Sequence, residues 1–160
     1  MRQCAIALGS NLGDSLNILE TTITLLSQHP SIELISHSSC YQTTPIGPPQ
    51  PDYLNSCATL KTSLTPENLL QTLLAIEQKF GRVRREKWGP RTLDLDLLLY
   101  DDLVLNTPSL EIPHPRMLER AFVLFPLNEI ATGWVHPVSK KTIQEHRNRL
   151  NCEGVKKLIN

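Results

Sequence analysis

The chain has 160 residues, and its 16 Lys and Arg side chains are balanced by 16 Asp and Glu side chains, so its formal net charge is zero. A general nucleic-acid binder or a protein of membrane surfaces is normally basic, so this balance argues against both classes. At about 150 residues per domain, the whole chain, residues 1–160, is predicted to form a single domain. No apolar run is long enough to span a bilayer.

The four cysteines, Cys4, Cys40, Cys57 and Cys152, are scattered and show no C-x-x-C spacing. Three of them stand in apolar, strand-like segments, so we expect reduced and mostly buried thiols rather than a disulfide or a metal site. The amino terminus runs almost directly into a predicted strand without a charged-then-apolar leader, and we therefore expect a cytoplasmic protein.

The amino-terminal part of the chain predicts a strand, a turn and a helix. Residues 4–9 are apolar and form the strand, and residues 10–14 form the turn, with Asp14 as a candidate helix cap. The helix has an apolar stripe at three- and four-residue spacing and stops at Pro30. The turn lacks the Lys-Ser/Thr of a phosphate-binding loop, so a structural turn is the better interpretation.

A proline-dense loop, residues 43–52, separates two predicted antiparallel strands at residues 32–42 and 56–62. Prolines restrict the unfolded loop and preset its shape. The residues alone leave two interpretations open, a plain stiff connection or a rigid wall of a ligand pocket.

A second helix begins at Thr65-Pro66, where Thr is a good cap and Pro suits the first turn. Gly81 is placed to end it in a left-handed conformation. Glu77 continues an apolar stripe of this helix, which fits either a residue at the margin of the core or one that faces a ligand.

The carboxy-terminal part contains shorter elements. Residues 103–106 are expected to return as the hairpin partner of the preceding strand, residues 121–127 to be buried, residues 142–150 to form a polar helix and residues 155–158 a short edge strand. The order β-α-β-β-α-β predicts an α+β fold, a ferredoxin-like αβα sandwich with a mostly antiparallel central sheet flanked by helices.

The segment that begins at residue 93 alternates sharply. Asp94 and Asp96 occupy one parity, and the other is occupied by Leu93, Leu95, Leu97 and Leu99. A strand therefore buries these leucines and projects both carboxylates from its opposite face. We expect this strand to be central in the sheet. Adjacent carboxylates are good ligands for Mg²⁺, which bridges phosphate oxygens. The alternative is two solvent-facing acids at a sheet edge.

Basic and aromatic residues could complete a phosphate and ring site. The loop 82–91 is cationic, and a guanidinium such as that of Arg91 can hold two phosphate oxygens at once, although a charge run is often only a solvated surface. Two rings and an amide, Tyr53, Phe122 and Asn55, could sandwich a flat heterocycle and read its edge. A Mg²⁺-dependent nuclease or phosphatase and a non-catalytic RNA-binding module remain alternatives.

The run Arg82-Val83-Arg84, followed by Trp88-Gly89-Pro90-Arg91-Thr92-Leu93-Asp94-Leu95-Asp96, closely resembles the signature of the 6-hydroxymethyl-dihydropterin pyrophosphokinases. The resemblance extends over nearly the whole chain, through Gly9-Ser10-Asn11-Leu12, Thr44-Pro45, Pro51-Asp52-Tyr53-Leu54-Asn55, Pro113-His114 and Arg120-Ala121-Phe122.

The resemblance implies transfer of the terminal pyrophosphate of ATP to the hydroxymethyl group of 6-hydroxymethyl-7,8-dihydropterin, with release of AMP, in folate biosynthesis. Two Mg²⁺ ions would act with ATP. The partners would be these small molecules alone, without nucleic acid or membrane, and we expect a monomer. No residue stands out as a strong general base, although Asp96 could relay a proton.

The resemblance also implies roles for individual residues. The catalytic set would be Arg82, Arg91, Asp94 and Asp96, with Asp94 and Asp96 as the metal ligands. The ATP contacts would be Glu77, Arg84, Trp88, Arg91, His114 and Arg120. The pterin contacts would be Thr43, Thr44, Pro45, Ile46, Tyr53, Asn55, Trp88 and Phe122.

Three features depart from the pattern of some members. Pro115 follows the histidine where those members have a tyrosine, and Leu74 replaces a polar residue. The cationic loop is one residue shorter, which bears on the geometry of a lid and on the role of Arg84.

Overall fold

A computed structural model describes residues 1–44, 49–80, 92–151 and 154–158 of the chain. The predictions for Pro45 and Ile46, for Gly81 and for the whole cationic loop 82–91 lie outside the described residues. Within the described part, no helix combines the length and the apolar character needed to cross a membrane.

The described residues form helices on both faces of an antiparallel sheet. In chain order the elements are β1 (Arg2–Ser10), α1 (Ser15–Gln28), β2 (Ile32–His37), β3 (Tyr41–Thr43), β4 (Tyr53–Thr62), α2 (Pro66–Lys79), β5 (Asp94–Tyr100), β6 (Leu105–Asn106), β7 (Glu111–Ile112), the 3₁₀ turn η1 (Met117–Glu119), α3 (Ala121–Ala131), α4 (Ile143–Asn148) and β8 (Val155–Lys157).

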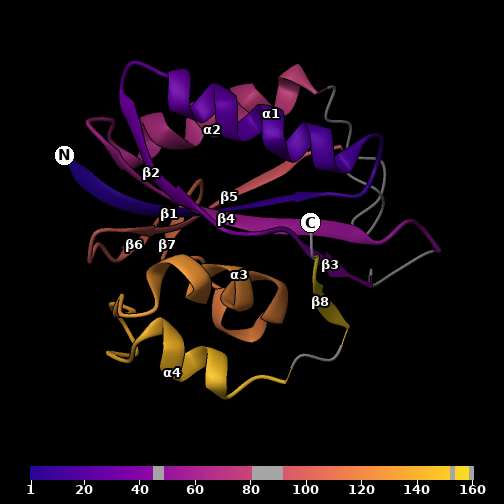
Figure 1. Cartoon of the computed structure of the whole chain (residues 1–160). Helices are drawn as coiled ribbons and strands as arrows, with labels where there is room; N and C mark the ends of the chain where they lie inside the picture. The colour runs from indigo at the N-terminus through magenta and orange to yellow at the C-terminus, as the bar shows by residue number, and fades with distance from the viewer. Residues whose placement is uncertain (45–48, 81–91, 152–153, 159–160) are drawn as a thin grey trace.

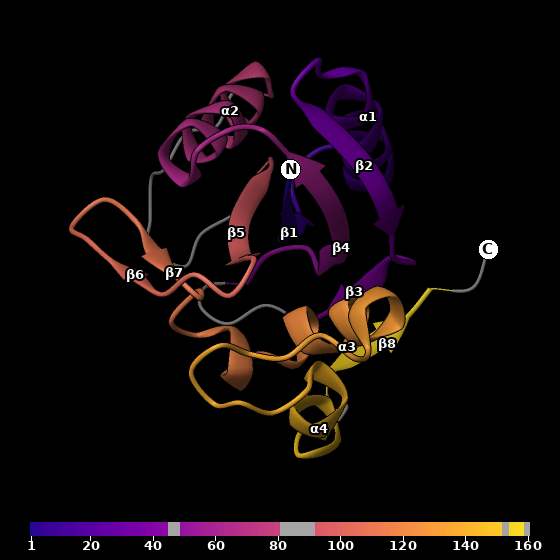
Figure 2. The same cartoon turned by 90° about the vertical axis from the view of Figure 1, so that its left-hand side faces the viewer.

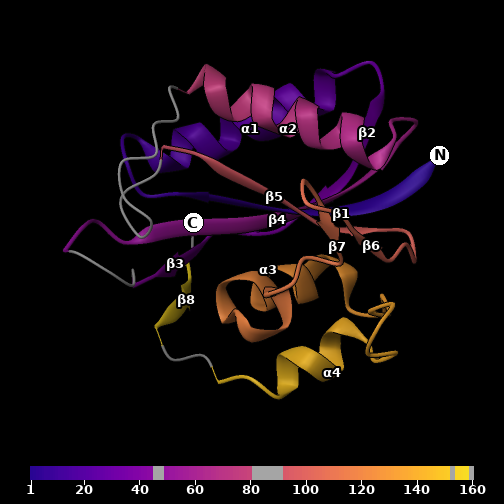
Figure 3. The same cartoon turned by 180° about the vertical axis from the view of Figure 1, so that it is seen from behind.

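The main sheet has the order β5-β1-β4-β3-β8, and β2 also pairs with β4. Figures 1 and 3 show α1 and α2 on one face and α3 and α4 on the other. The view in Figure 2 places the same two layers on opposite sides of the strands. This is the predicted α+β sandwich.

The predicted helix starts are confirmed by their capping hydrogen bonds. The Asp14 carboxylate accepts from the backbone N–H of Asn17 at 3.3 Å, and the Thr65 hydroxyl accepts from the N–H of Asn68 at 3.2 Å. Thr142 forms a reciprocal capping box with Glu145 at the start of α4. These side chains satisfy N–H groups that have no partner inside their own helix.

Each face of the sheet has its own hydrophobic core. The core under α1 and α2 takes Ile6 and Leu8 of β1 with Leu95 and Leu97 of β5. The core under α3 takes small β1 residues, including Ala7, together with side chains from the other end of β5 and from α3. Successive residues of one strand thus enter different cores, as the two-residue period requires.

The expected burial of the apolar segment 121–127 is confirmed for residues 123–127, which lie in helix α3. The structure corrects three predictions about the elements. The strand expected at residues 32–42 is divided into β2 and β3. Residues 105–106 pair with 111–112 rather than with β5. The acid-bearing strand is not central, because β5 ends the strand order of the described sheet. Its leucine face is nevertheless buried, because the α1–α2 layer covers it.

A β-bulge interrupts β5 and breaks the predicted alternation of its leucines. Leu97 lies opposite Ile6, whereas Leu99 lies opposite Ala5, so Leu98 is an extra residue without a partner on β1. Leu98 and Leu99 both enter the α3 core. A bulge places two residues opposite one and resets the parity of the strand, so Leu99 faces away from Leu95 and Leu97.

Cys4, Cys40 and Cys57 are free thiols, as expected, and Cys152 lies outside the described residues. Burial raises the pKa of the Cys4 thiol to about 12 and also raises that of Cys57, whose thiol contacts the carbonyl oxygen of Val123 at 3.5 Å. These are thiols of the core, not activated nucleophiles.

Candidate active site

Asp94 and Asp96 project from the face of the sheet that α3 covers. Asp96 lies opposite Ala7 on β1, and Asp94 lies opposite Gly9. Directly opposed residues of antiparallel strands share a face, and Ala7 belongs to the α3 core. Both aspartates are half-buried. The predicted projection of the two acids from one face, away from Leu95, is confirmed.

His114 and Arg120 lie within electrostatic range of the acid pair. Burial lowers the pKa of His114, and the negative charge of Asp96 opposes this shift. Burial also lowers the pKa of Arg120, against the opposing charges of Asp96 and Asp94. The structure thus brings these two predicted phosphate contacts to the carboxylates, where they place positive charge and donors beside the acids.

The orientation of His114 is fixed by its backbone and by its ring. Its N–H donates to the carbonyl oxygen of Leu98 at 3.0 Å, so the bulged residue of β5 anchors the loop that carries the histidine. The ring Nδ1 accepts from the N–H of Arg116 at 3.2 Å. With Nδ1 accepting, the neutral ring carries its proton on Nε2. His114 is therefore preset to donate from Nε2.

Gly9 connects the acid pair to the predicted pterin contacts. It lies between Asp94 on β5 and Asn55 on β4. A Cβ at position 9 would lie only 3.0 Å from the Asn55 Oδ1 atom, so the missing side chain makes room for the amide. Asn55 is 7% exposed, and its Nδ2 donates to the Thr43 hydroxyl at 3.0 Å.

The two predicted ring partners differ in their surroundings. Tyr53 lies at the start of β4, opposite Thr43 and half-buried. Phe122 lies in the first turn of α3, packed at the margin of the α3 core, and the Arg120 guanidinium carbon is 5.5 Å from its ring centroid. Thr44 is exposed. Pro45 and Ile46, and the residues Arg82, Arg84, Trp88 and Arg91, lie outside the described residues.

Glu77 is buried at the edge of β5. Its side chain is 2% exposed, and its Oε2 atom accepts from the backbone N–H of Leu95 at 2.7 Å. Leu95 is the residue between the two aspartates. Of the two interpretations left open by the sequence, the structure supports a position in the core. A contact with ATP stays a prediction of the resemblance.

Asn11 is a residue whose role sequence reasoning missed. It is 3% exposed, and its Nδ2 donates to the Gln50 Oε1 atom at 2.8 Å and to the Pro51 carbonyl oxygen at 2.9 Å. The residue that follows β1 thereby holds Gln50 and Pro51 of the proline-dense loop. A buried asparagine directly after a strand was the available signal, but its partners lie about 40 positions away in the sequence.

The donor set fits a hard cation held jointly by protein and substrate. Among the residues that the structure describes, no group of three or more His, Cys, Asp or Glu side chains forms a site of its own. Mg²⁺ is usually bound through one or two carboxylates together with substrate phosphates, rather than in an all-protein cage. Asp94 and Asp96 meet that requirement.

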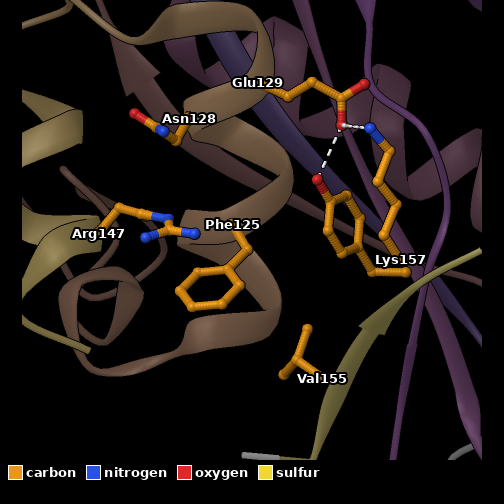
Figure 4. Close-up of a pocket in the computed structure, with 7 residues that line it drawn as sticks. Phe125, Asn128, Glu129, Arg147, Val155 and Lys157 are labelled. Atoms are coloured by element: carbon orange, nitrogen blue, oxygen red, sulfur yellow. Dashed lines mark hydrogen bonds and ion pairs between the residues drawn. The ribbon is translucent and has the colours of Figure 1, made fainter. Parts of the chain in front are cut away.

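A cavity of about 410 Å³ lies away from the acid pair, between β3, α3, α4 and β8 (Figure 4). In it the Arg147 guanidinium stacks on Phe125, with 4.5 Å from its carbon to the ring centroid. Glu129 accepts from the Tyr41 hydroxyl at 2.8 Å and pairs with Lys157 at 3.9 Å. None of the predicted site residues lines this cavity, so we do not assign the reaction to it.

Comparisons with known proteins point to one family. Residues 5–132 match the family model described as 7,8-dihydro-6-hydroxymethylpterin-pyrophosphokinase. The chain is 53% identical over 157 residues to a 2-amino-4-hydroxy-6-hydroxymethyldihydropteridine pyrophosphokinase of Synechocystis, covering 96% of this chain and 80% of the relative. A protein of the same name from Bacillus subtilis is 48% identical over 126 residues, covering 78% and 75%.

Solved structures support the fold. The HPPK-DHPS triple mutant of Plasmodium falciparum with SDX-DHP superposes with a TM-score of 0.77 at 16% identity, covering 98% of this chain and 45% of that one. The wild-type protein with SDX-DHP superposes with a TM-score of 0.75 at 17% identity, covering 98% and 47%. This chain thus spans about half the length of those two structures.

Proposed function

Because this chain belongs to the 7,8-dihydro-6-hydroxymethylpterin-pyrophosphokinase family and is a pyrophosphotransferase of folate biosynthesis, we propose that ATP is its donor, that Mg²⁺ is its cofactor and that Asp94 and Asp96 hold the metal. The observation that carries this proposal is the position of the two carboxylates, beside His114 and Arg120 and next to Asn55 across Gly9.

In this proposal the hydroxyl of the pterin attacks the β-phosphorus of ATP. A new O–P bond forms, the bond between the β-phosphorus and the oxygen shared with the α-phosphate breaks, and AMP leaves with that oxygen. The hydroxyl proton passes to Asp96 or to solvent. Mg²⁺ neutralises charge on the phosphate oxygens when it is bound.

The chain's own residues bind and orient the reactants. Asn55, fixed by Thr43, offers one amide oxygen and one N–H to the edge of the pterin. Arg120 and the Nε2 proton of His114 stabilise charge on the triphosphate. Holding hydroxyl and phosphorus in line is the larger contribution expected of such a site. Arg82 and Arg91 stay predicted phosphate contacts from the resemblance.

The two alternative functions lose their support. A nuclease or phosphatase and an RNA-binding module were compatible with the paired acids and the basic loop alone. Membership of the family, together with the position of Asn55 across Gly9 from Asp94, favours the transfer of pyrophosphate to a small heterocycle.

The products of one incubation test the reaction. Purified protein with ATP, Mg²⁺ and 6-hydroxymethyl-7,8-dihydropterin should form AMP and the pterin diphosphate in equal amounts. Formation of ADP would show single-phosphate transfer and contradict the proposal. Omission of the pterin should abolish AMP formation, because hydrolysis is not the reaction.

The metal role is tested by Asp94→Asn and Asp96→Asn. Each change should lower kcat/KM by roughly 100-fold, in the range seen for lost electrostatic stabilisation, while the protein stays folded. Asp102→Asn, in the exposed turn after β5, is the matched control and should keep wild-type rates. Near-normal rates of either site variant at limiting Mg²⁺ would refute the assignment.

We further propose that the chain is a single-domain monomer in the cytoplasm. Light scattering coupled to size exclusion tests the monomer, because a mass near twice the 18.0 kDa of the chain would show a dimer.

A further inference from the structure

A buried carboxylate holds the backbone of β5 between the two candidate metal ligands. Glu77 lies near the end of α2, and its side chain is 98% shielded from solvent. Its Oε2 atom accepts from the Leu95 N–H at 2.7 Å. This distance lies in the range of charge-assisted hydrogen bonds.

The position of β5 in the sheet explains why the N–H of Leu95 needs a hydrogen-bond acceptor outside the sheet. β5 is the end strand of the described sheet and pairs only with β1 there. Leu95 lies opposite Leu8, yet its N–H is directed to Glu77 rather than to β1. A buried N–H without an acceptor would cost about 1–3 kcal/mol. The carboxylate of α2 therefore takes the place of a neighbouring strand.

We infer that Glu77 is a positioning residue, which fixes the peptide of Leu95 and thereby the directions of the Asp94 and Asp96 carboxylates. The inference rests on the proposed metal role of those two aspartates. Mg²⁺ demands near-ideal octahedral geometry. Groups that hold metal ligands in place typically contribute about 10–100-fold to metal affinity.

The hydrogen bond from Leu95 to Glu77 supports the acid pair on the side of β5 where no second strand pairs with it in the described sheet. The side chains of residues 94 and 96 leave the sheet on one face, whereas Leu95 enters the opposite core. The Leu95 peptide is thus held by its side chain in the core, by β1 on one side and by Glu77 on the other. Only the last of these three supports can be removed without disturbing the core leucines or the pairing with β1.

Two substitutions separate positioning from other roles. Glu77→Gln keeps the volume and an oxygen that accepts from the Leu95 N–H, whereas Glu77→Leu removes the acceptor. Glu67→Leu, near the exposed start of the same helix, is the matched control. A purely structural role predicts that Glu77→Leu lowers thermal stability while the folded protein binds metal normally.

The experiment measures the binding of Mn²⁺ in the presence of α,β-methylene-ATP. The electron paramagnetic resonance signal of free Mn²⁺ reports how much of the metal remains unbound. The methylene group replaces the oxygen whose bond to the β-phosphorus would break, so no turnover occurs. Glu77→Leu should bind Mn²⁺ about 10–100-fold more weakly, while Glu77→Gln and Glu67→Leu stay within about threefold of wild type. In turnover, saturating Mg²⁺ should restore most of the kcat of Glu77→Leu.

Equal Mn²⁺ affinity of Glu77→Leu and wild type overturns the inference, and so does an equal loss in Glu77→Gln, which would indicate a role of the charge itself. If Glu77→Leu does not fold, Glu77→Asp replaces it. The shorter carboxylate cannot reach Leu95 as closely, so it should weaken Mn²⁺ binding at least threefold, and wild-type affinity would again overturn the inference. Absence of Mn²⁺ binding by the wild-type protein would instead contradict the proposed function.

Discussion

Replacing Gly9 with alanine tests whether the close contact between β1 and Asn55 sets the affinity for the pterin. The added Cβ would lie 3.0 Å from the Asn55 Oδ1 atom and 3.9 Å from both the Leu54 carbonyl oxygen and the Tyr53 Cδ1 atom. Only the first contact is shorter than ordinary van der Waals distance. The amide of Asn55 must therefore shift by a few tenths of an ångström.

The magnitude follows from the hydrogen bond that fixes this amide. Asn55 Nδ2 donates to the Thr43 hydroxyl at 3.0 Å, and a net hydrogen bond contributes about 0.5–1.5 kcal/mol. If the shift removes this bond, affinity for the pterin should fall roughly two- to twelvefold, since 1.4 kcal/mol corresponds to a factor of ten. The backbone of Gly9 is not in the left-handed region, so alanine introduces no strain of its own.

The assay is isothermal titration with the pterin in the presence of α,β-methylene-ATP, together with urea denaturation. Gly133→Ala is the control, because a Cβ there meets nothing within 4 Å. It should leave binding unchanged and raise stability by about 0.4–1 kcal/mol through the unfolded state. Wild-type pterin affinity in Gly9→Ala would refute the reasoning, and a loss confined to the nucleotide would show that Gly9 serves the acid pair instead.

Two further predictions concern pH and stability. Burial lowers the pKa values of His136 and His146 in the folded state below the ordinary 6.5. Their contribution to the free energy of unfolding is therefore complete above pH 6.5 and decreases as the pH falls toward the folded-state pKa values. Urea denaturation should show that the wild type loses stability over this pH range and that His146→Asn loses less. Glu129→Gln should lower the free energy of unfolding by about 0.5–1 kcal/mol, because the carboxylate of this exposed residue accepts from Ser39 and Tyr41. Burial raises the pKa of Glu129, but these hydrogen bonds outweigh burial and lower the pKa overall. The stability difference between Glu129→Gln and wild type should therefore be present above pH 4.5 and disappear as the pH falls through the folded-state pKa of Glu129. A stability difference that persists in acid would contradict this reasoning.

The sequence predicted the features that neighbouring residues determine, namely the helix starts and the faces of a strand. The caps at Asp14 and Thr65 lie directly before the apolar stripes that they start, so α1 and α2 could be placed from the sequence. The projection of Asp94 and Asp96 from one face follows from the two-residue period of a strand. The identity of the substrate did not come from these patterns but from the resemblance, which the comparisons confirm.

The errors concern features that distant residues decide. The edge position of β5 depends on which strands pair, and its buried leucine face imitates a central strand because the α1–α2 layer covers it. The bulge at Leu98 depends on the register with β1. Residues 121–127 are apolar throughout and show neither the helical nor the strand periodicity of apolar and polar residues. Their burial could therefore be predicted from the sequence, but their helical conformation could not. The bond from Glu77 to Leu95 joins positions 18 residues apart and carries no local signal.

The bulge at Leu98 has a consequence for how this strand can change during evolution. The register of the acid half of β5 is set by Ala7 and Gly9, and that of the apolar half by Ala5. Substitutions beyond the bulge are thereby separated from the geometry of the acids. A deletion of Leu98, in contrast, would leave Leu97 opposite Ile6 and Leu99 opposite Ala5, but it would remove the carbonyl oxygen that accepts from the backbone N–H of His114. We therefore expect homologous sequences to vary in side-chain identity here while keeping the length of the strand constant.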